Sequence, residues 1–151
     1  MIPEQPYANC NDARFMDVLL IHGIGRRNFL AMNLKEIIEL VDGTSLNPQV
    51  DLNVKIRGGI GADLMSDVLA ASQPKAVLLT GLTNPQVVRT AQIAEFRAII
   101  FVRGKQPQPE TIAIATQENM PLISSPFGMF ELCGRLRQAG LPSFESNVPT
   151  R

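Results

Sequence analysis

Residues 76–102 read AVLLTGLTNPQVVRTAQIAEFRAIIFV, in which two wholly apolar segments flank a turn and an amphipathic stretch. A strand that is covered on both faces reads as a continuous apolar run, as Ala76-Val77-Leu78-Leu79 and residues 98–102 do. Parallel neighbours in a sheet need a crossover of about a dozen or more residues, usually a helix. The stretch therefore predicts two central parallel strands, 76–80 and 98–102, joined by a right-handed crossover through a helix at 85–95.

The same rhythm extends in both directions along the chain. Short apolar strands are expected to begin at Val54, Ala76, Ala98 and Leu122, about every 22 residues, and each is followed by a turn and a helical pattern. A chain of 151 residues with 45% hydrophobic residues is long enough for one well-packed core. The predicted fold is α/β, a single compact domain with a mostly parallel sheet of four to five strands and helices packed on its faces.

Small and polar residues mark the ends of the other elements. Apolar and polar residues alternate from Val50 to Arg57, which predicts a strand with one wet face at or near a sheet edge, followed by a glycine turn at Gly58–Gly61. Asp63 is expected to cap the next helix, 64–71. Other helix starts are expected at Asn33 with Glu36 in a capping box, Asn84-Pro85, Gln108-Pro109 before a helix at 110–118, and Ser125-Pro126, with stops at Gly43, Asn119 and Gly140.

The first 31 residues contain two misleading motifs. Val18-Leu19-Leu20-Ile21-His22-Gly23 resembles the strand and turn of α/β-hydrolases, but the chain lacks their Gly-x-Ser-x-Gly elbow. Arg26-Arg27 resembles a twin-arginine export signal, but residues 33–37 after it are charged and helical. We expect residues 1–31 to be an N-terminal extension outside a folded domain at 32–141, with a C-terminal tail at 142–151. We also hypothesise that Met32 is the native start.

The charge balance argues against several classes of partner. Fourteen basic and fourteen acidic residues cancel, so the chain lacks the electrostatic footprint of a nucleic-acid-binding protein. No apolar run approaches the roughly 18 residues of a membrane span. Cys10 and Cys133 make neither a disulfide framework nor a metal cluster, which fits a reducing, cytoplasmic location.

Several segments along the predicted strands and helices form a recognisable pattern. They are Gly61-Ala62-Asp63-Leu64-Met65-Ser66-Asp67-Val68, Ala76-Val77-Leu78-Leu79-Thr80, Asn84-Pro85-Gln86-Val87-Val88, Ala98-Ile99-Ile100-Phe101-Val102-Arg103-Gly104, Pro109-Glu110-Thr111, Met120-Pro121-Leu122-Ile123-Ser124-Ser125 and Phe130-Glu131-Leu132-Cys133-Gly134-Arg135-Leu136. Over residues 32–141 the chain resembles the small stand-alone DRTGG-domain proteins of anaerobic and thermophilic bacteria. It departs from the signature itself, because Asp-Arg-Thr is replaced near Thr83-Asn84-Pro85 and the Gly-Gly pair is represented by Arg103-Gly104.

This resemblance implies a compact α/β regulatory module. Such modules are also attached to phosphate acetyltransferases and to nucleotide-binding CBS-domain pyrophosphatases, and they are similar to the N-terminal domain of HPr serine kinase without its catalytic domain. Stand-alone members sit beside iron-hydrogenase and sensor-kinase components, and modules in larger proteins resemble dimerisation elements. The resemblance therefore implies a homodimer and a redox-enzyme or sensor-kinase partner.

The loops after parallel strands meet at the carboxyl edge of the sheet, where ligands bind. The candidate ligand-binding residues at this edge are Gly81, Thr83, Asn84, Arg103, Lys105, Ser124 and Ser125. A glycine turn that enters a helix, as at Gly81, aims backbone N–H groups outward and attracts phosphate or carboxylate, and Arg103 and Lys105 add positive charge. The alternative is that Gly81 only relieves a turn, Asn84 only caps its helix and the charges are solvated.

Other chemistry finds little support in the residues. No nucleophile–base pair or phosphate-binding kinase loop is visible, and the glycine run at Gly58–Gly61 misses the third glycine of a dinucleotide fingerprint because Leu64 holds that place. Asp63 and Asp67 invite a metal site but are better explained as a helix cap and a solvated side chain. Cys133 on an apolar helix face indicates a buried residue rather than a redox centre.

Three hypotheses about function follow. The leading one is a non-catalytic regulatory module that senses a small anionic metabolite or a nucleotide. The second is a structural interaction subunit of a redox or signalling assembly without a ligand, and the third is an enzyme of unrecognised type, with no cofactor identified. We also expect a homodimer, because Phe127, Met129 and Phe130 near a helix start, together with the open strand at 50–57, favour a self-complementary contact.

Overall fold

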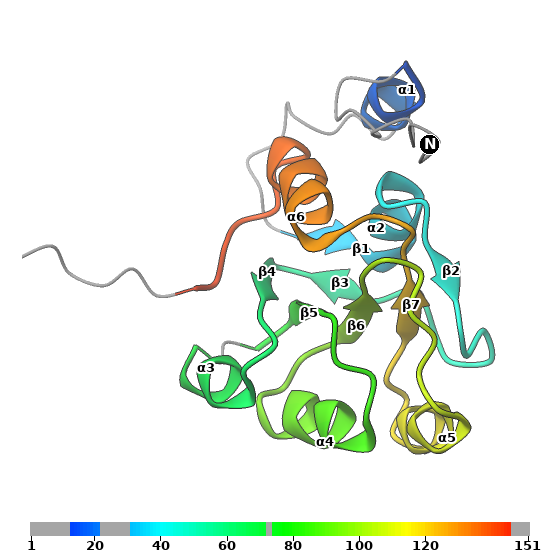
Figure 1. The fold of residues 1–151 in the computed structure, drawn as a ribbon. Helices are drawn as coiled ribbons and strands as arrows, with labels where there is room; N and C mark the ends of the chain where they lie inside the picture. Colours follow the sequence, from blue (N-terminus) through cyan, green and yellow to red (C-terminus); the bar gives the residue numbers. More distant parts are fainter. Residues whose placement is uncertain (1–12, 22–30, 72–73, 146–151) are drawn as a thin grey trace, which may run out of the picture.

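The computed structural model describes residues 13–21, 31–71 and 74–145, and it contains the predicted α/β fold. Its main sheet has five strands in the order β2-β7-β6-β5-β4 (Figure 1). Four of them are parallel: β4 (Gly58–Gly61), β5 (Ala76–Thr80), β6 (Ala98–Phe101) and β7 (Leu122–Ser124). The fifth, β2 (Thr44–Ser45), is antiparallel to β7 at one edge. The mostly parallel sheet of a single α/β domain is thus confirmed.

Helices cover both faces of this sheet (Figure 1). One face carries α3 (Met65–Ala70), α4 (Pro85–Ile93) and α5 (Pro109–Gln117), which connect successive parallel strands. The other face carries α2 (Leu34–Leu40) and α6 (Met129–Gln138), and α1 (Ala13–Ile21) lies outside α2. None of the helices in the described residues is long and apolar enough to span a membrane.

The central strands are apolar throughout because both of their faces are covered. Val77 and Leu79 of β5 point to the α2 and α6 side, whereas Ala76 and Leu78 point to α3, α4 and α5. The alternation of a strand therefore divides one apolar run between two core clusters. The prediction of central parallel strands at 76–80 and 98–102 is confirmed, with β6 ending one residue earlier than expected.

The predicted strand at Val50–Arg57 was largely wrong. Only Lys55–Ile56 forms a strand (β3), and it pairs with β1 (Met32–Asn33) in a separate two-stranded antiparallel sheet. The strand beside β5 is instead Gly58–Gly61, where a turn was expected. Glycines allow α6 and the residues after it to pack closely there, since a Cβ on Gly59 would lie 3.2 Å from Leu141 Cδ2 and a Cβ on Gly61 would lie 3.2 Å from Met129 Sδ.

Helix ends confirm some predictions and correct others. The capping box of Asn33 and Glu36 is present at the start of α2. Asn119 and Gly140 have positive φ angles just after α5 and α6, as expected of helix stops. Asp63 is not a cap, because the N-cap of α3 is Leu64 and makes no side-chain bond. The last helix begins after Gly128, not at Ser125-Pro126.

Parts of the expected extension and tail contact the folded domain. Val18 of α1 packs against the core cluster beneath α2 and α6, and Arg14 forms an exposed ion pair with Asp42 at 3.1 Å. Residues 142–145 run along β4, with Gly59 and Ser143 forming a parallel bridge. His22, Arg26-Arg27 and Cys10 lie outside the described residues.

Candidate functional site at the carboxyl edge of the sheet

The carboxyl edge of the sheet contains one topological switch point, between β6 and β7. The chain leaves β6 for α5 on one face and leaves β7 for α6 on the other face (Figure 1). Open α/β sheets bind their ligands in the crevice that opens where neighbouring connections diverge in this way. Arg103, Lys105 and Ser125 lie in the two diverging loops, and Ser124 is the last residue of β7.

The loop after β6 is a tight turn held in a strained conformation. Arg103 and Gly104 have φ angles of 58° and 62°, and the Lys105 N–H donates to the Val102 carbonyl at 3.2 Å. A left-handed conformation is uncommon for a residue with a side chain and, where it occurs, often marks a functional position. The strain is held by the neighbouring loop, because the Arg103 N–H donates to the Phe127 carbonyl at 2.8 Å and the Gly104 N–H to the Ser125 carbonyl at 2.7 Å.

A chain of hydrogen bonds joins the ends of all four parallel strands. The Ser124 hydroxyl donates to the Lys105 carbonyl at 3.1 Å, and the Lys105 ammonium donates to the Gly81 carbonyl at 2.9 Å. The Gly81 N–H then donates to the Asp63 carboxylate at 2.7 Å, which also accepts from the buried Thr80 hydroxyl at 2.9 Å. The loops after β4, β5, β6 and β7 are therefore held together by polar contacts.

Asp63 is a member of this edge that sequence reasoning missed. Its place before a helical pattern predicts a helix cap, but its carboxylate crosses to the end of β5. The sequence signal that exists is its place two residues after Gly61, the last residue of β4, where a side chain of the first loop meets the second. Its negative charge restricts anion binding next to Gly81.

The remaining predicted site residues have different surroundings. The Thr83 carbonyl accepts from the Thr111 hydroxyl at 2.9 Å, so this residue ties α5 to the loop before α4. Asn84 is the exposed N-cap residue of α4, and its side chain makes no cap bond. Ser125 points away from the edge, since its buried hydroxyl donates to the Val41 carbonyl at 2.7 Å.

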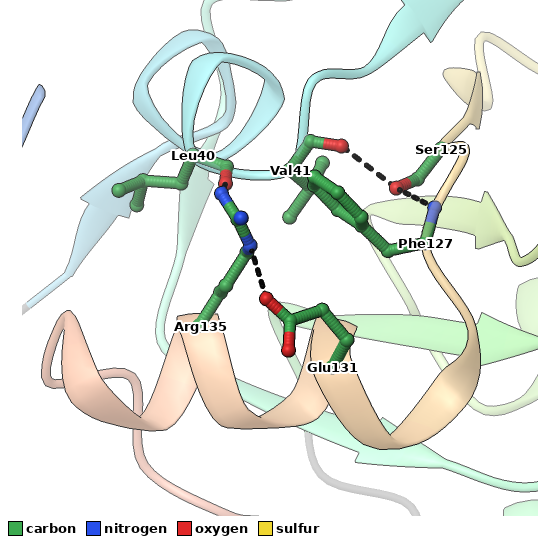
Figure 2. A network of polar contacts seen from close by, with 6 residues as sticks. All are labelled: Leu40, Val41, Ser125, Phe127, Glu131 and Arg135. Atoms are coloured by element: carbon green, nitrogen blue, oxygen red, sulfur yellow. Dashed lines mark hydrogen bonds and ion pairs between the residues drawn. The ribbon is translucent and has the colours of Figure 1, made fainter. Parts of the chain in front are cut away.

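Ser125 belongs to a polar network that links the site to α2 and α6. Figure 2 shows its hydroxyl between the Val41 carbonyl and the Phe127 N–H, at 2.7 and 3.3 Å. Arg135, which is only 3% exposed, pairs with Glu131 at 2.9 Å, donates to the Leu40 carbonyl at 3.4 Å and stacks 4.0 Å from the centre of the Phe127 ring. These donors satisfy carbonyls at the end of α2, which a helix cannot pair internally.

The exposed guanidinium of Arg103 is the free positive charge of the edge. Its side chain has no hydrogen bond or ion pair with any of the residues that the structure describes, whereas the Lys105 ammonium is engaged by Gly81. A Cβ on Gly128 would lie 3.8 Å from Arg103 Nε, which places the guanidinium near the start of α6. A cation beside a helix N-terminus attracts an anion more strongly than either alone.

The described residues hold no group of three or more His, Cys, Asp or Glu side chains that could bind a metal ion. Asp63 is engaged with Thr80 and Gly81, and Asp67 lies exposed on α3. Burial, and to a lesser degree the charge of Glu145, raises the pKa of the Cys133 thiol. A protonated thiol is a poor nucleophile, so the geometry favours a packing role for Cys133.

No protein-family model matches the chain, and no curated protein sequence is significantly similar to it. Its fold is similar to that of the CBS and DRTGG domains of the regulatory region of Clostridium perfringens pyrophosphatase, solved in complex with the activator diadenosine tetraphosphate. The TM-score is 0.61 at 15% identity, over 84% of this chain and 57% of the other. The chain thus spans little more than half the length of that structure, and the similarity supports a fold of the CBS and DRTGG kind. The similarity to HPr serine kinase stays a prediction.

Proposed function

We propose that this chain is a non-catalytic regulatory module that binds a small anionic metabolite or a nucleotide at the carboxyl edge of its sheet. The ligand contacts Arg103 and the neighbouring loops between β6 and β7. Lys105 lies in the same loop as Arg103, and Gly81 and Asn84 line the same edge one strand further on. The similar pyrophosphatase structure is a regulatory region with a nucleotide activator, which supports a ligand-sensing role for this fold.

The observation that carries the proposal is the strained, exposed Arg103 at the topological switch point. The turn that holds it needs two successive residues with positive φ, whose N–H groups donate two hydrogen bonds to carbonyls of the next loop. An arginine in this conformation costs about 1–2 kcal/mol relative to glycine. An anion site gains from this cost an exposed guanidinium that can donate two hydrogen bonds to one phosphate or carboxylate.

The test is binding of AMP, ATP, acetyl phosphate and inorganic phosphate to the wild type and to Arg103→Ala. A ligand that binds only the folded state raises its stability by RT ln(1 + [L]/Kd), about 2.7 kcal/mol at one hundred times Kd. Arg103→Ala is expected to weaken binding by about 1.5–3 kcal/mol, because a charge-assisted hydrogen bond is lost. Calorimetry and thermal unfolding in the presence of each compound measure both effects.

Arg103→Gly is the matched control for backbone strain. Both variants lack the guanidinium and should lose the same affinity. Glycine relieves the left-handed strain, so the free energy of unfolding of Arg103→Gly should be about 1 kcal/mol higher than that of Arg103→Ala. If none of the four compounds stabilises the wild type, or if Arg103→Ala binds as tightly as the wild type, the site does not lie at this edge.

A second candidate function is a structural interaction subunit of a redox-enzyme or sensor-kinase assembly. The observation in its favour is that Lys105, Ser124, Ser125 and Gly81 already bond to one another or to the α2 end. A loop edge of this kind positions a surface for a protein partner without any ligand. Co-purification of a partner that is retained by Arg103→Ala, with no stabilisation by small anions, favours this alternative.

A further inference from the structure

The segment at residues 142–145 lies along the outer edge of β4 (Figure 1). The Gly59 N–H donates to the Pro142 carbonyl at 2.9 Å, and the Phe144 N–H donates to the Gly59 carbonyl at 3.0 Å. An edge strand otherwise leaves such groups open for pairing with another chain. The edge of β4 is thus able to bind an extended, parallel peptide through its backbone.

This edge also has a slot for an aromatic ring. A Cβ on Gly58 would overlap the ring of Phe144, so only glycine at this position leaves room for the ring. Phe144 packs against the core cluster under α3 and α4, and it remains partly exposed. The slot exists because Gly58 has no side chain, and the flat ring of Phe144 occupies it.

One residue further on, the edge selects a carboxylate. Glu145 Oε1 accepts from the Gly61 N–H at 3.0 Å, which gives that backbone donor a side-chain partner instead of a ladder partner. Main-chain bonds supply affinity and side-chain pockets supply specificity when a peptide adds to a sheet edge. The pair Phe144-Glu145 therefore defines what the edge recognises.

The segment leaves the groove around it partly empty. A hollow of about 150 Å³ remains between Gly59, Cys133, Leu136 and Ser143, and a second hollow of about 450 Å³ lies between β4, α3 and Glu145. Ser143 is too small to fill the first hollow, whose inner wall includes Leu79, Leu136 and Leu141. A bulkier apolar side chain at that position of a bound peptide would bury more apolar surface than the chain's own serine does.

We infer that the β4 edge is a docking groove for an extended segment of a partner protein with the pattern apolar, aromatic, acidic, and that residues 143–145 occupy it as an intramolecular substitute. The partner segment adds to β4 as a parallel strand, places its ring over Gly58 and its carboxylate on the Gly61 N–H, and fills the hollow beside Leu136 with its apolar residue. The chain's own segment must leave first, so it sets a threshold for binding.

The probe is a fluorescent peptide with the sequence of residues 140–145 carrying Ser143→Leu, titrated into the full chain. Phe144→Ala in the chain weakens its own segment and should bind the peptide at least tenfold more tightly than the wild type does. The reason is competition, since a tethered segment acts at an effective concentration of about millimolar. Fluorescence anisotropy gives the affinities, and circular dichroism confirms that each variant is folded.

Two controls test the recognition itself. Adding Gly58→Ala to the Phe144→Ala chain fills the slot and should reduce peptide binding at least tenfold, and a peptide with Phe144→Ala should bind no variant. Equal binding to wild type and Phe144→Ala, or binding unaffected by Gly58→Ala, overturns the inference. If Phe144→Ala does not fold, Glu145→Lys provides the weakened segment in its place. A wild-type dimer that Phe144→Ala dissociates would instead make a second copy of this chain the occupant.

Discussion

The packing around the Cys133 side chain changes the pKa of its thiol. Its thiol projects from α6 and lies half-buried against the glycines of β4, and a Cβ on Gly61 would lie 3.3 Å from its sulfur. Burial opposes the thiolate, and the nearby charge of Glu145 opposes it further, so the pKa of the thiol rises above its ordinary value of 9.0. The expectation of a packed rather than a redox cysteine agrees with this environment.

The raised pKa predicts a loss of stability at high pH. Below pH 9.0 the thiol is protonated in the folded and unfolded states, and its contribution to folding is fully present. Above that pH the unfolded thiol ionises first, so the free energy of unfolding falls until the pH passes the folded pKa. Urea unfolding between pH 8 and 10.5, in a Cys10→Ser background, measures the effect.

Cys133→Ala is the control, because lysine and tyrosine residues also titrate in this range. The stability difference between the parent and Cys133→Ala should shift against the parent as the pH rises above 9.0. A difference that stays constant over the whole range contradicts the raised pKa.

At the scale of elements, the left-handed backbone and the close packing after α2 fall on two different residues, Asp42 and Gly43. Gly43 was expected to take the left-handed position after the helix, but Asp42 takes it, with a φ of 49°. The Gly43 N–H closes the helix on the Ile38 carbonyl at 2.8 Å. Gly43 is needed for space instead, since a Cβ there would lie 2.7 Å from Ile123 Cγ2.

The two positions should therefore respond in opposite directions. Asp42→Gly is expected to raise the free energy of unfolding by up to about 1 kcal/mol, because it relieves left-handed strain and loses only an exposed ion pair. Gly43→Ala should lower it by about 1–3 kcal/mol through overpacking against Ile123. Urea unfolding of both variants measures this difference.

Gly104→Ala serves as a reference for strain without a clash. Gly104 has a φ of 62°, and a Cβ there would have no neighbour within 4 Å. Gly104→Ala should lower the free energy of unfolding less than Gly43→Ala does. Equal stability of Asp42→Gly and Gly43→Ala would show that neither strain nor packing differs at these positions.

At the scale of the whole molecule, the predicted homodimer depends on a smaller surface than expected. Phe127 is partly buried under Arg135, and Met129 packs against the core, whereas Phe130 at the start of α6 is 93% exposed. The strand at 50–57 offers no open edge in the main sheet, because only Lys55–Ile56 is a strand and it pairs with β1. Phe130 is therefore the residue on which the prediction now rests.

We expect a homodimer at micromolar concentration that Phe130→Ser weakens at least tenfold. Each copy would bury a phenylalanine worth about 1.5–3 kcal/mol, and a two-fold contact uses both. Sedimentation equilibrium of the wild type and the variant measures the association constant. Ile93→Ser, which removes another exposed apolar residue, at the end of α4 and 74% exposed, should leave the association unchanged. A single species near monomer mass at high micromolar concentration would contradict the predicted homodimer.

The sequence alone determined the elements that carry their own pattern. Residues 76–79 and 98–101 are apolar on both faces, as is typical of central parallel strands, and Pro85 and Pro109 start helices because their missing N–H costs nothing there. Parallel strands need crossovers, and the crossovers bring the loop with Arg103 and Lys105 to the same edge of the sheet as the loops after the other parallel strands. The α/β fold and the location of the candidate site follow from local periodicity.

Only the tertiary structure decided the elements that have no pattern of their own. Gly58–Gly61 has only the Ile60 side chain to signal a strand, and it becomes one because β5 needs a neighbour and α6 packs closely on glycine. Asp63 looks like a helix cap in the sequence, but its partners Thr80 and Gly81 lie 17 and 18 residues away, and the Leu40 carbonyl that accepts from Arg135 lies 95 residues away. Such contacts depend on which surfaces meet after folding, and no sequence window contains both partners.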